Sequence, residues 1–150
     1  MIKITLPDGS IKEYNEAVSG YQIAVDISPR LAKEVLSITV NEEVWDLQRL
    51  ITNDSSIKLH KWDDEEGKHA FWHSSAHLMA EALEAMYPGI KLGIGPSIEN
   101  GFYYDVDLPE GKVITDSDFP KIEAKMKELA QQKNEYNRSE VPKAEAMDFY

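Results

Sequence analysis

Two histidines stand four residues apart in the stretch HSSAHLMAEAL, which covers residues 73–83. In a helix, residues four apart lie on one face, so the imidazoles of His73 and His77 point the same way. An imidazole changes its charge near neutral pH, and it can take a proton from water, hydrogen-bond a substrate or bind a metal ion. The spacing therefore offers general acid–base chemistry or half of a metal site.

The same spacing occurs in zinc hydrolases, where a glutamate that acts as the base follows the first histidine. Ser74 stands at that place here, and a zinc ion needs at least one more protein ligand. His69 and Glu81, each one helical turn away from the pair, are weak candidates for that ligand. Spacing alone favours a structural or incidental pair, and it leaves the functional interpretation open.

Other catalytic signatures are missing from the sequence. Gly93-Ile94-Gly95-Pro96 does not fit a dinucleotide fingerprint, because a hairpin follows where a helix is required, and no GK[ST] phosphate loop occurs. The chain has no cysteine, which excludes a disulfide framework or a thiolate metal site within these residues. Gly93 and Gly95 instead predict a strand that another backbone or a ligand approaches closely.

Charge and hydropathy limit the partners. The net charge is −11, and residues 63–150 carry 9 Lys+Arg against 18 Asp+Glu. Nucleic-acid binders usually present a basic face, so we do not expect this chain to bind a polyanion strongly by itself. No run approaches the roughly 18 apolar residues that span a bilayer, and the N-terminus lacks a signal-peptide core, so we expect a cytoplasmic protein without membrane contact.

The elements that must position the histidines form two predicted modules of an α+β protein, residues 1–62 and 63–150. In the first module, two alternating runs joined by Pro7-Asp8-Gly9 predict a hairpin. A helix with Ser19 as its N-cap follows, and Ser28-Pro29 interrupts it. Strand-like residues follow at 36–40, 43–45 and 57–62. The resulting order, ββαβββ, is that of a ubiquitin-like β-grasp.

Four acidic residues and Gly67 separate the two modules and predict a solvated hinge. A helix follows over residues 69–86 and ends before Pro88-Gly89. Its apolar residues form so wide a stripe that we expect a long helix, largely buried against an antiparallel sheet.

The second module continues with a hairpin and further helices. Asn100-Gly101 predicts a type I′ turn, and Tyr103 and Tyr104 after it are expected to point to opposite faces of a strand. Ser117-Asp118 with Pro120 starts a helix that runs to about residue 133. Residues 142–150 predict an amphipathic helix without a C-cap, so we expect the chain to be part of a longer protein.

Two stretches in this order resemble one known family. ITLPDGS in a β-grasp layout resembles the TGS domain, and HSSAHLMAEAL followed by IGPSIENGFYYDVDLP is similar to the editing domain of bacterial threonyl-tRNA synthetases. The resemblance covers the whole chain, the acidic segment included. The sequence departs from the family's pattern at one turn. After Val40 it has Asn41-Glu42-Glu43, where Asn-Gly is common in the family.

The resemblance implies a ligase that uses ATP to charge tRNA(Thr) with threonine and a second site that hydrolyses mischarged seryl-tRNA(Thr). Such a site is needed because the single methyl group that serine lacks discriminates by only about 1–3 kcal/mol. The family's histidine pair lines the editing pocket, so His73 and His77 are the implied catalytic residues, which position or deprotonate a water. Tyr104, Gly95 and Pro96 are the implied substrate-binding residues.

The resemblance also implies what lies outside residues 1–150. A Cys-x-x-x-His element that completes the pocket is expected farther along, so the chain alone should be inactive as a deacylase. ATP, Mg²⁺ and a zinc ion belong to a catalytic domain beyond the chain, and no metal is expected at the histidine pair. The implied partners are the acceptor end of tRNA(Thr) and a second subunit bound through absent domains. The alternatives are a metal-binding HxxxH hydrolase and a non-catalytic TGS-type interaction module.

Overall fold

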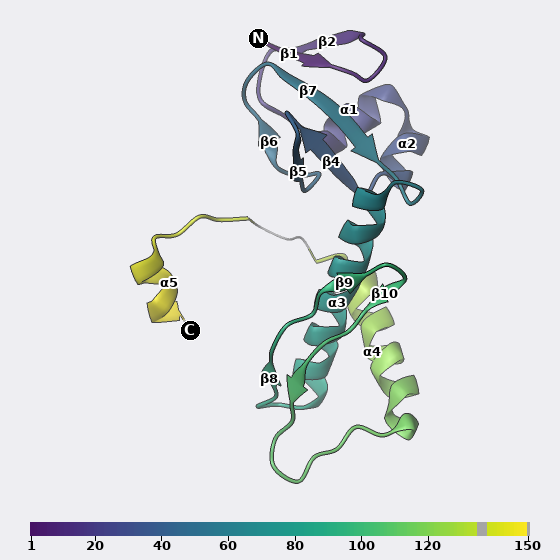
Figure 1. Cartoon of the computed structure of the whole chain (residues 1–150), viewed down its shortest axis with the longest axis vertical. Coiled ribbons are helices and arrows are strands. Elements are labelled where there is room, and N and C mark those ends of the chain that lie inside the picture. Colours follow the sequence, from purple (N-terminus) through teal and green to yellow (C-terminus); the bar gives the residue numbers. More distant parts are fainter. Residues whose placement is uncertain (135–137, 150) are drawn as a thin grey trace.

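The structure, a computed structural model, describes residues 1–134 and 138–149. The chain is an elongated α+β molecule with a strand-rich unit at one end and two longer helices with small hairpins at the other (Figure 1). Helix α3 (Glu65–Met86) starts beside the strand-rich unit and runs along the second part. The predicted α+β class is confirmed. No helix among the described residues combines the length and hydropathy needed to cross a membrane.

A mixed five-stranded sheet dominates the first part, in the order β2-β1-β7-β4-β5. Only β1 and β7 pair in parallel, and the other neighbours are antiparallel. The five strands predicted for residues 1–62 are all present, as β1 (Ile2–Thr5), β2 (Ile11–Tyr14), β4 (Ser37–Val40), β5 (Glu43–Trp45) and β7 (Ser55–His60). Two further strands, which the sequence did not predict, form a short separate pair, β3 (Val18–Ser19) with β6 (Leu50–Ile51).

Two short helices accompany the sheet. Helix α1 (Gly20–Ile27) begins as predicted, because the Ser19 hydroxyl accepts a hydrogen bond from the backbone N–H of Gln22. Ser28 then ends α1 and caps α2 (Pro29–Glu34), which the sequence did not predict. Proline suits the first position of a helix, where no N–H is needed, so Pro29 starts a helix as well as ending one.

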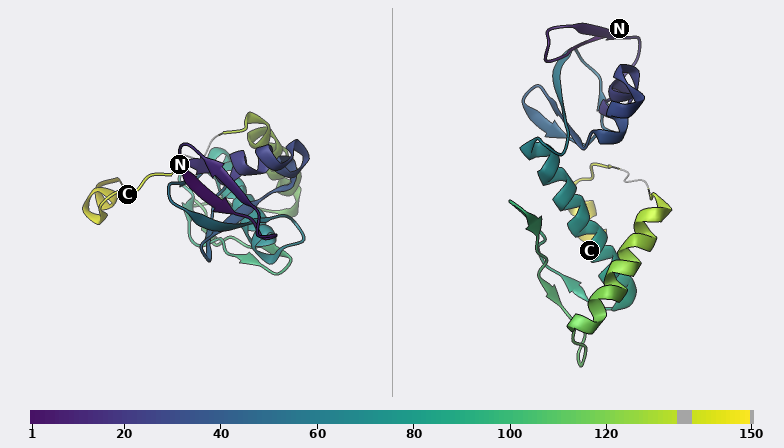
Figure 2. Two further views of the ribbon diagram at one scale, coloured as in Figure 1. Left: turned by 90° about the horizontal axis from the view of Figure 1, so that it is seen from above. Right: turned by 90° about the vertical axis from the view of Figure 1, so that its right-hand side faces the viewer.

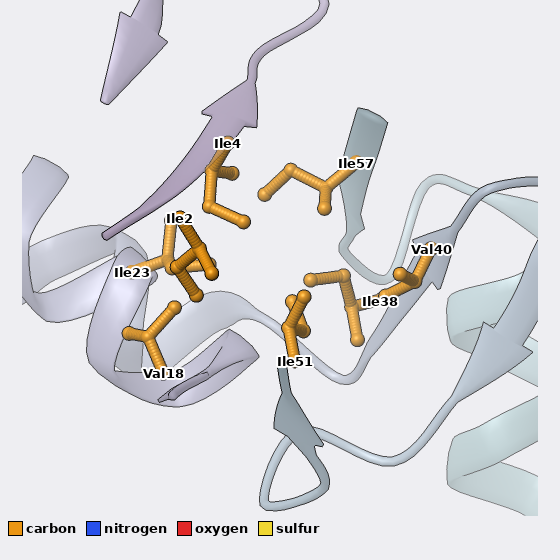
Figure 3. Close-up of a cluster of buried hydrophobic side chains, with 8 residues drawn as sticks. All are labelled: Ile2, Ile4, Val18, Ile23, Ile38, Val40, Ile51 and Ile57. Atoms are coloured by element: carbon orange, nitrogen blue, oxygen red, sulfur yellow. The ribbon is translucent and has the colours of Figure 1, made fainter. Parts of the chain in front are cut away.

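The core of the first part consists of eight β-branched side chains that meet between the sheet and α1 (Figure 3). These side chains are at most 9% exposed. Branched side chains suit a half-buried pleated surface, which explains why the segments that carry most of them form strands. The eight residues are Ile2, Ile4, Val18, Ile23, Ile38, Val40, Ile51 and Ile57.

The acidic segment between the two parts is not a hinge, and that prediction is wrong. Helix α3 starts at Glu65, four residues earlier than predicted, with Asp64 at its N-cap. Asp64 accepts a hydrogen bond from the backbone N–H of Lys61 at 2.9 Å. Gly67 lies so close to Lys61 that an added Cβ would be 1.9 Å from the Lys61 carbonyl oxygen. Helix α3 therefore packs tightly against the end of β7.

Helix α3 is less buried than predicted. The expectation of a largely buried helix is wrong, because Phe71 remains 41% exposed and only five of the 22 residues of the helix are buried. Helix α4 (Phe119–Gln132), which starts close to the predicted position, packs along α3 and buries Ile122 and Leu129 (Figure 2). Helix α5 (Lys143–Phe149) falls within the predicted last helix, whose residue 150 lies outside the described residues.

Two small antiparallel pairs replace the single sheet expected beside α3. They are β8 (Lys91–Leu92) with β11 (Val106–Asp107), and β9 (Ser97–Ile98) with β10 (Gly101–Phe102). The predicted hairpin is present, but Glu99 and Asn100 form its turn, one residue earlier than expected. Neither has a positive φ, so the predicted type I′ turn is wrong.

Candidate functional site

His73 and His77 project from consecutive turns of α3 and meet at their ring edges. Their Nε2 atoms are 3.1 Å apart, and the ring planes stand at 90°. At this distance one ring donates its Nε2–H to the lone pair of the other. Both side chains are exposed. The predicted common face of the two imidazoles is confirmed, and the pair lies open to solvent.

The surroundings of His73 favour the neutral form of its ring. Desolvation of the ring by neighbouring protein atoms, and then the charges that His77 and His69 would carry, lower the pKa of His73 from its usual value of 6.5. A neutral imidazole at pH 7 can accept a proton or bind an electrophile.

His69 lies on the same strip of α3, one turn before His73, where the sequence made it only a weak candidate ligand. Since α3 starts at Glu65, His69 lies in the second turn rather than at a frayed end. Its Nδ1 is 3.1 Å from the hydroxyl of Ser97 on β9, and its ring centroid is 6.1 Å from that of His73. The acidic residues before it also suited the N-terminal end of the helix from the sequence, because acidic side chains favour the first turn, and Glu65 and Glu66 occupy that turn.

The predicted substrate-binding residues lie beyond the ends of the hairpin. An added Cβ on Gly95 would be 2.3 Å from two carbons of the Tyr104 ring, so the ring rests directly on Gly95. Pro96, next to Gly95, is half-buried, as is Tyr104. At Gly93 an added Cβ would be 3.0 Å from the Asp105 carbonyl oxygen. The predicted close approach of another backbone is confirmed at Gly93, whereas a side chain is the neighbour at Gly95 and the predicted strand ends at Leu92.

The structure thus brings the predicted residues together in two groups, the imidazole pair and the Gly95–Tyr104 contact. The hairpin between them is tied to α3 by the Ser97–His69 contact and by Phe102, whose ring centroid is 6.3 Å from that of Trp72. A groove of about 680 Å³ lies between the five-stranded sheet and α3, and His73 lines it. Other residues along this groove include Leu36, Val44, Trp45, Leu47 and Ala70.

The imidazole pair alone would provide only part of a metal site. Two ligands on a tetrahedral zinc ion, each roughly 2.0–2.1 Å from it, are about 3.3 Å apart, close to the observed 3.1 Å. Within residues 1–134 and 138–149, the one group of three ligating side chains with all donor atoms within 4.8 Å lies elsewhere, at His60, Asp64 and Glu66. A metal at His73 and His77 would therefore need ligands from outside the described residues.

Comparisons with known proteins give the family. Residues 2–61 match the TGS domain. The whole chain is 62% identical to the threonine–tRNA ligase of Parabacteroides distasonis, 59% to that of Porphyromonas gingivalis and 56% to that of Cytophaga hutchinsonii. In each case the chain spans 23% of the length of the relative that it matches. The chain is therefore the counterpart of the N-terminal portion of bacterial threonine–tRNA ligases, with a TGS domain at its start.

Proposed function

We propose that this chain forms part of a threonine–tRNA ligase, an enzyme that uses ATP to join threonine to tRNA(Thr). The support is an identity of 54–62% across essentially the whole chain with proteins of that name. We assign ATP, Mg²⁺, the zinc ion of the catalytic domain and the subunit contact of a homodimer to the part of the protein beyond these residues. In this assignment residues 1–62 are the TGS domain, and residues 63–150 are the first part of the editing domain.

We further propose that His73 and His77 form half of a site that hydrolyses seryl-tRNA(Thr). The observation that carries this role is the exposed pair of imidazoles with Nε2 atoms 3.1 Å apart. Hydrolysis needs a group that takes a proton from the attacking water and a group that returns one to the leaving ribose oxygen. A pair that holds one shared proton can do both. The lowered pKa of His73 leaves its ring free to accept the proton at neutral pH.

We propose that the pocket wall that distinguishes serine from threonine by the size of the side chain is formed by Tyr104, Gly95 and Pro96. Serine and threonine differ by one methyl group, so a wall that selects between them must be rigid at that scale. The Tyr104 ring is held against Gly95, where a methyl group would already overlap it. Such a contact leaves little room for the ring to move.

The test is accumulation of mischarged tRNA by the full-length protein. The protein is incubated with ATP, serine and tRNA(Thr), and seryl-tRNA is measured over time. The variant with both His73→Ala and His77→Ala should accumulate seryl-tRNA while charging threonine at the wild-type rate. Glu84→Ala, at an exposed position on the same helix, is the matched control and should remain free of mischarged product. A double variant that accumulates no more seryl-tRNA than wild type would exclude the proposal.

The spacing of the pair gives one other function a specific basis. The 3.1 Å between the Nε2 atoms also suits two ligands of a zinc ion, as in a metal-dependent HxxxH hydrolase. Removal of metal by a chelator separates the two functions. Seryl-tRNA hydrolysis that survives the chelator favours the metal-free mechanism, and hydrolysis that is lost and restored by zinc favours the metal-dependent one.

A further inference from the structure

His60 is a buried histidine at the joint between the sheet and α3. It ends β7, and its side chain is 1% exposed. Its Nε2 lies 2.6 Å from the hydroxyl oxygen of Thr39 on β4. Its Nδ1 is buried and has no hydrogen-bond partner among the residues that the structure describes. Leaving a buried polar atom unpaired is costly, so this nitrogen needs an explanation.

Two carboxylates face the unpaired nitrogen. Glu66 Oε2 lies 3.4 Å from His60 Nδ1, without the alignment that a hydrogen bond requires. Asp64 completes the group, and one donor atom from each of the three side chains lies within 4.8 Å of the other two. A buried nitrogen and two carboxylates therefore converge on one point.

The spacing and the tautomer suit a metal ion. Two ligands roughly 2.0–2.1 Å from a tetrahedral zinc ion are about 3.3–3.4 Å apart, which matches the separation of Nδ1 and Oε2. When His60 donates its Nε2–H to the Thr39 hydroxyl, Nδ1 keeps a lone pair for the metal. Histidines that bind metals are commonly oriented by such a hydrogen bond from the other ring nitrogen.

The carboxylates are held in place and can be reached by solvent. Asp64 is fixed by the backbone N–H of Lys61, and the Ser37 hydroxyl donates to the backbone carbonyl of Glu66 at 3.4 Å. The side chains of Asp64 and Glu66 are 28% and 41% exposed, so an ion can enter and keep water as a remaining ligand. Lys58, 3.4 Å from Asp64 Oδ1, offsets one of the two negative charges.

We propose that His60 Nδ1, Asp64 and Glu66 form a binding site for a divalent transition-metal ion of the zinc type. One imidazole nitrogen and two carboxylate oxygens are ligands that Zn²⁺ accepts, with water in the fourth position. The ion joins the end of β7 to the first turn of α3. It thereby fixes the TGS domain relative to the helix that carries His73 and His77, and this role is independent of the chemistry proposed for that pair.

The experiment is a metal titration of the chain in which His73→Ala and His77→Ala remove the other histidine pair. Zn²⁺ binding is measured by calorimetry, and Co²⁺ is used as a probe because its visible spectrum reports tetrahedral coordination. The proposal predicts one equivalent of bound metal. Glu66→Gln and Asp64→Asn, both at partly exposed side chains, should each weaken binding by roughly tenfold or more. Glu65→Gln, an acidic neighbour outside the group, is the matched control and should bind as before.

A second measurement reads His60 directly, without a substitution in the buried position. In NMR spectra of the histidine rings, addition of Zn²⁺ should shift His60 Nδ1 while Nε2 stays protonated. The proposal is overturned if Zn²⁺ does not saturate a site up to millimolar concentration, or if Glu66→Gln and Asp64→Asn bind it as tightly as Glu65→Gln. It is also overturned if Nδ1 is protonated at neutral pH in the presence of zinc, which would identify a simple ion pair with Glu66.

Discussion

Gly67 lies directly against the backbone that follows β7, and replacing it with alanine tests how closely α3 packs there. An added Cβ would lie 1.9 Å from the carbonyl oxygen of Lys61 and 2.7 Å from its carbon. Both atoms belong to the backbone, so no side-chain rotation can make room. The first turn of α3 or the end of β7 must move by about 1.5 Å or more to restore an ordinary contact distance.

One favourable and two unfavourable effects determine the change in the free energy of unfolding. Alanine is favoured over glycine inside a helix by about 1 kcal/mol. Overpacking against rigid surroundings costs about 1–3 kcal/mol. Displacement of the helix also breaks the hydrogen bond from Lys61 N–H to the Asp64 carboxylate, worth about 1.5 kcal/mol for a charged acceptor that is partly exposed. Gly67→Ala should therefore destabilise the chain by about 2 kcal/mol.

Urea unfolding, followed by circular dichroism, measures this change. Gly67→Ala should lower the free energy of unfolding by about 2 kcal/mol. Lys68→Ala, at the next position of the same helix, controls for a new alanine without the overlap and should change stability by less than about 0.5 kcal/mol. A Gly67→Ala variant that is more stable than wild type by about 1 kcal/mol, as helix propensity alone demands, would refute the reasoning.

Three further outcomes follow from individual contacts. NMR titration should give His73 a pKa below 6.5, and His77→Ala should raise that pKa, because His77 is one cause of the lowering. The pKa of His73 in the folded state lies below its pKa in the unfolded state. The contribution of His73 to stability is therefore complete above pH 6.5 and is lost as pH falls from there toward the folded pKa. A wild-type His73 that titrates at 6.5 would contradict this. Glu42→Gly should stabilise the chain by about 0.5 kcal/mol in urea unfolding, because Glu42 has a φ of 74° that glycine adopts without strain; a loss of stability would count against the turn geometry. Gly95→Ala should shift the NMR signals of the Tyr104 ring, which the new methyl group must displace, and an unchanged ring would mean that the contact is absent.

Features with a local geometric cause were predictable from the sequence. A serine that can cap a helix is enough to place the start of α1 at Ser19. The HxxxH spacing alone puts His73 and His77 on one face, and the structure confirms their contact. Gly93 likewise predicted the close approach of another backbone, which the Asp105 carbonyl oxygen makes. In each case a few neighbouring residues carry the whole signal.

Features that depend on distant partners were not predictable in the same way. Four acidic residues resemble a solvated linker until the backbone of Lys61 and the buried ring of His60 engage Asp64 and Glu66. Helix α3 therefore starts at Glu65 and not at His69, so His69 lies in its second turn, one turn before His73. Its partner Ser97 is 28 residues away, beyond the reach of any local pattern.

The burial of α3 was overestimated for a related physical reason. An apolar stripe shows which residues a helix can bury, and it does not show which other segments are present to cover them. Phe71 belongs to the predicted stripe and is 41% exposed among the described residues. Where a partner is near, as at Ala76 and Leu83, the same stripe is buried.

Hydrolysis of preformed seryl-tRNA(Thr) by the full-length protein is the most direct test of the proofreading role of the imidazole pair. Because general acid–base catalysis contributes roughly 10²–10⁴-fold, His73→Ala and His77→Ala should each slow release of serine by about a hundredfold or more. Threonine charging should remain unchanged in both variants. Release of serine at the wild-type rate by either variant would contradict the assignment of that histidine to the chemistry.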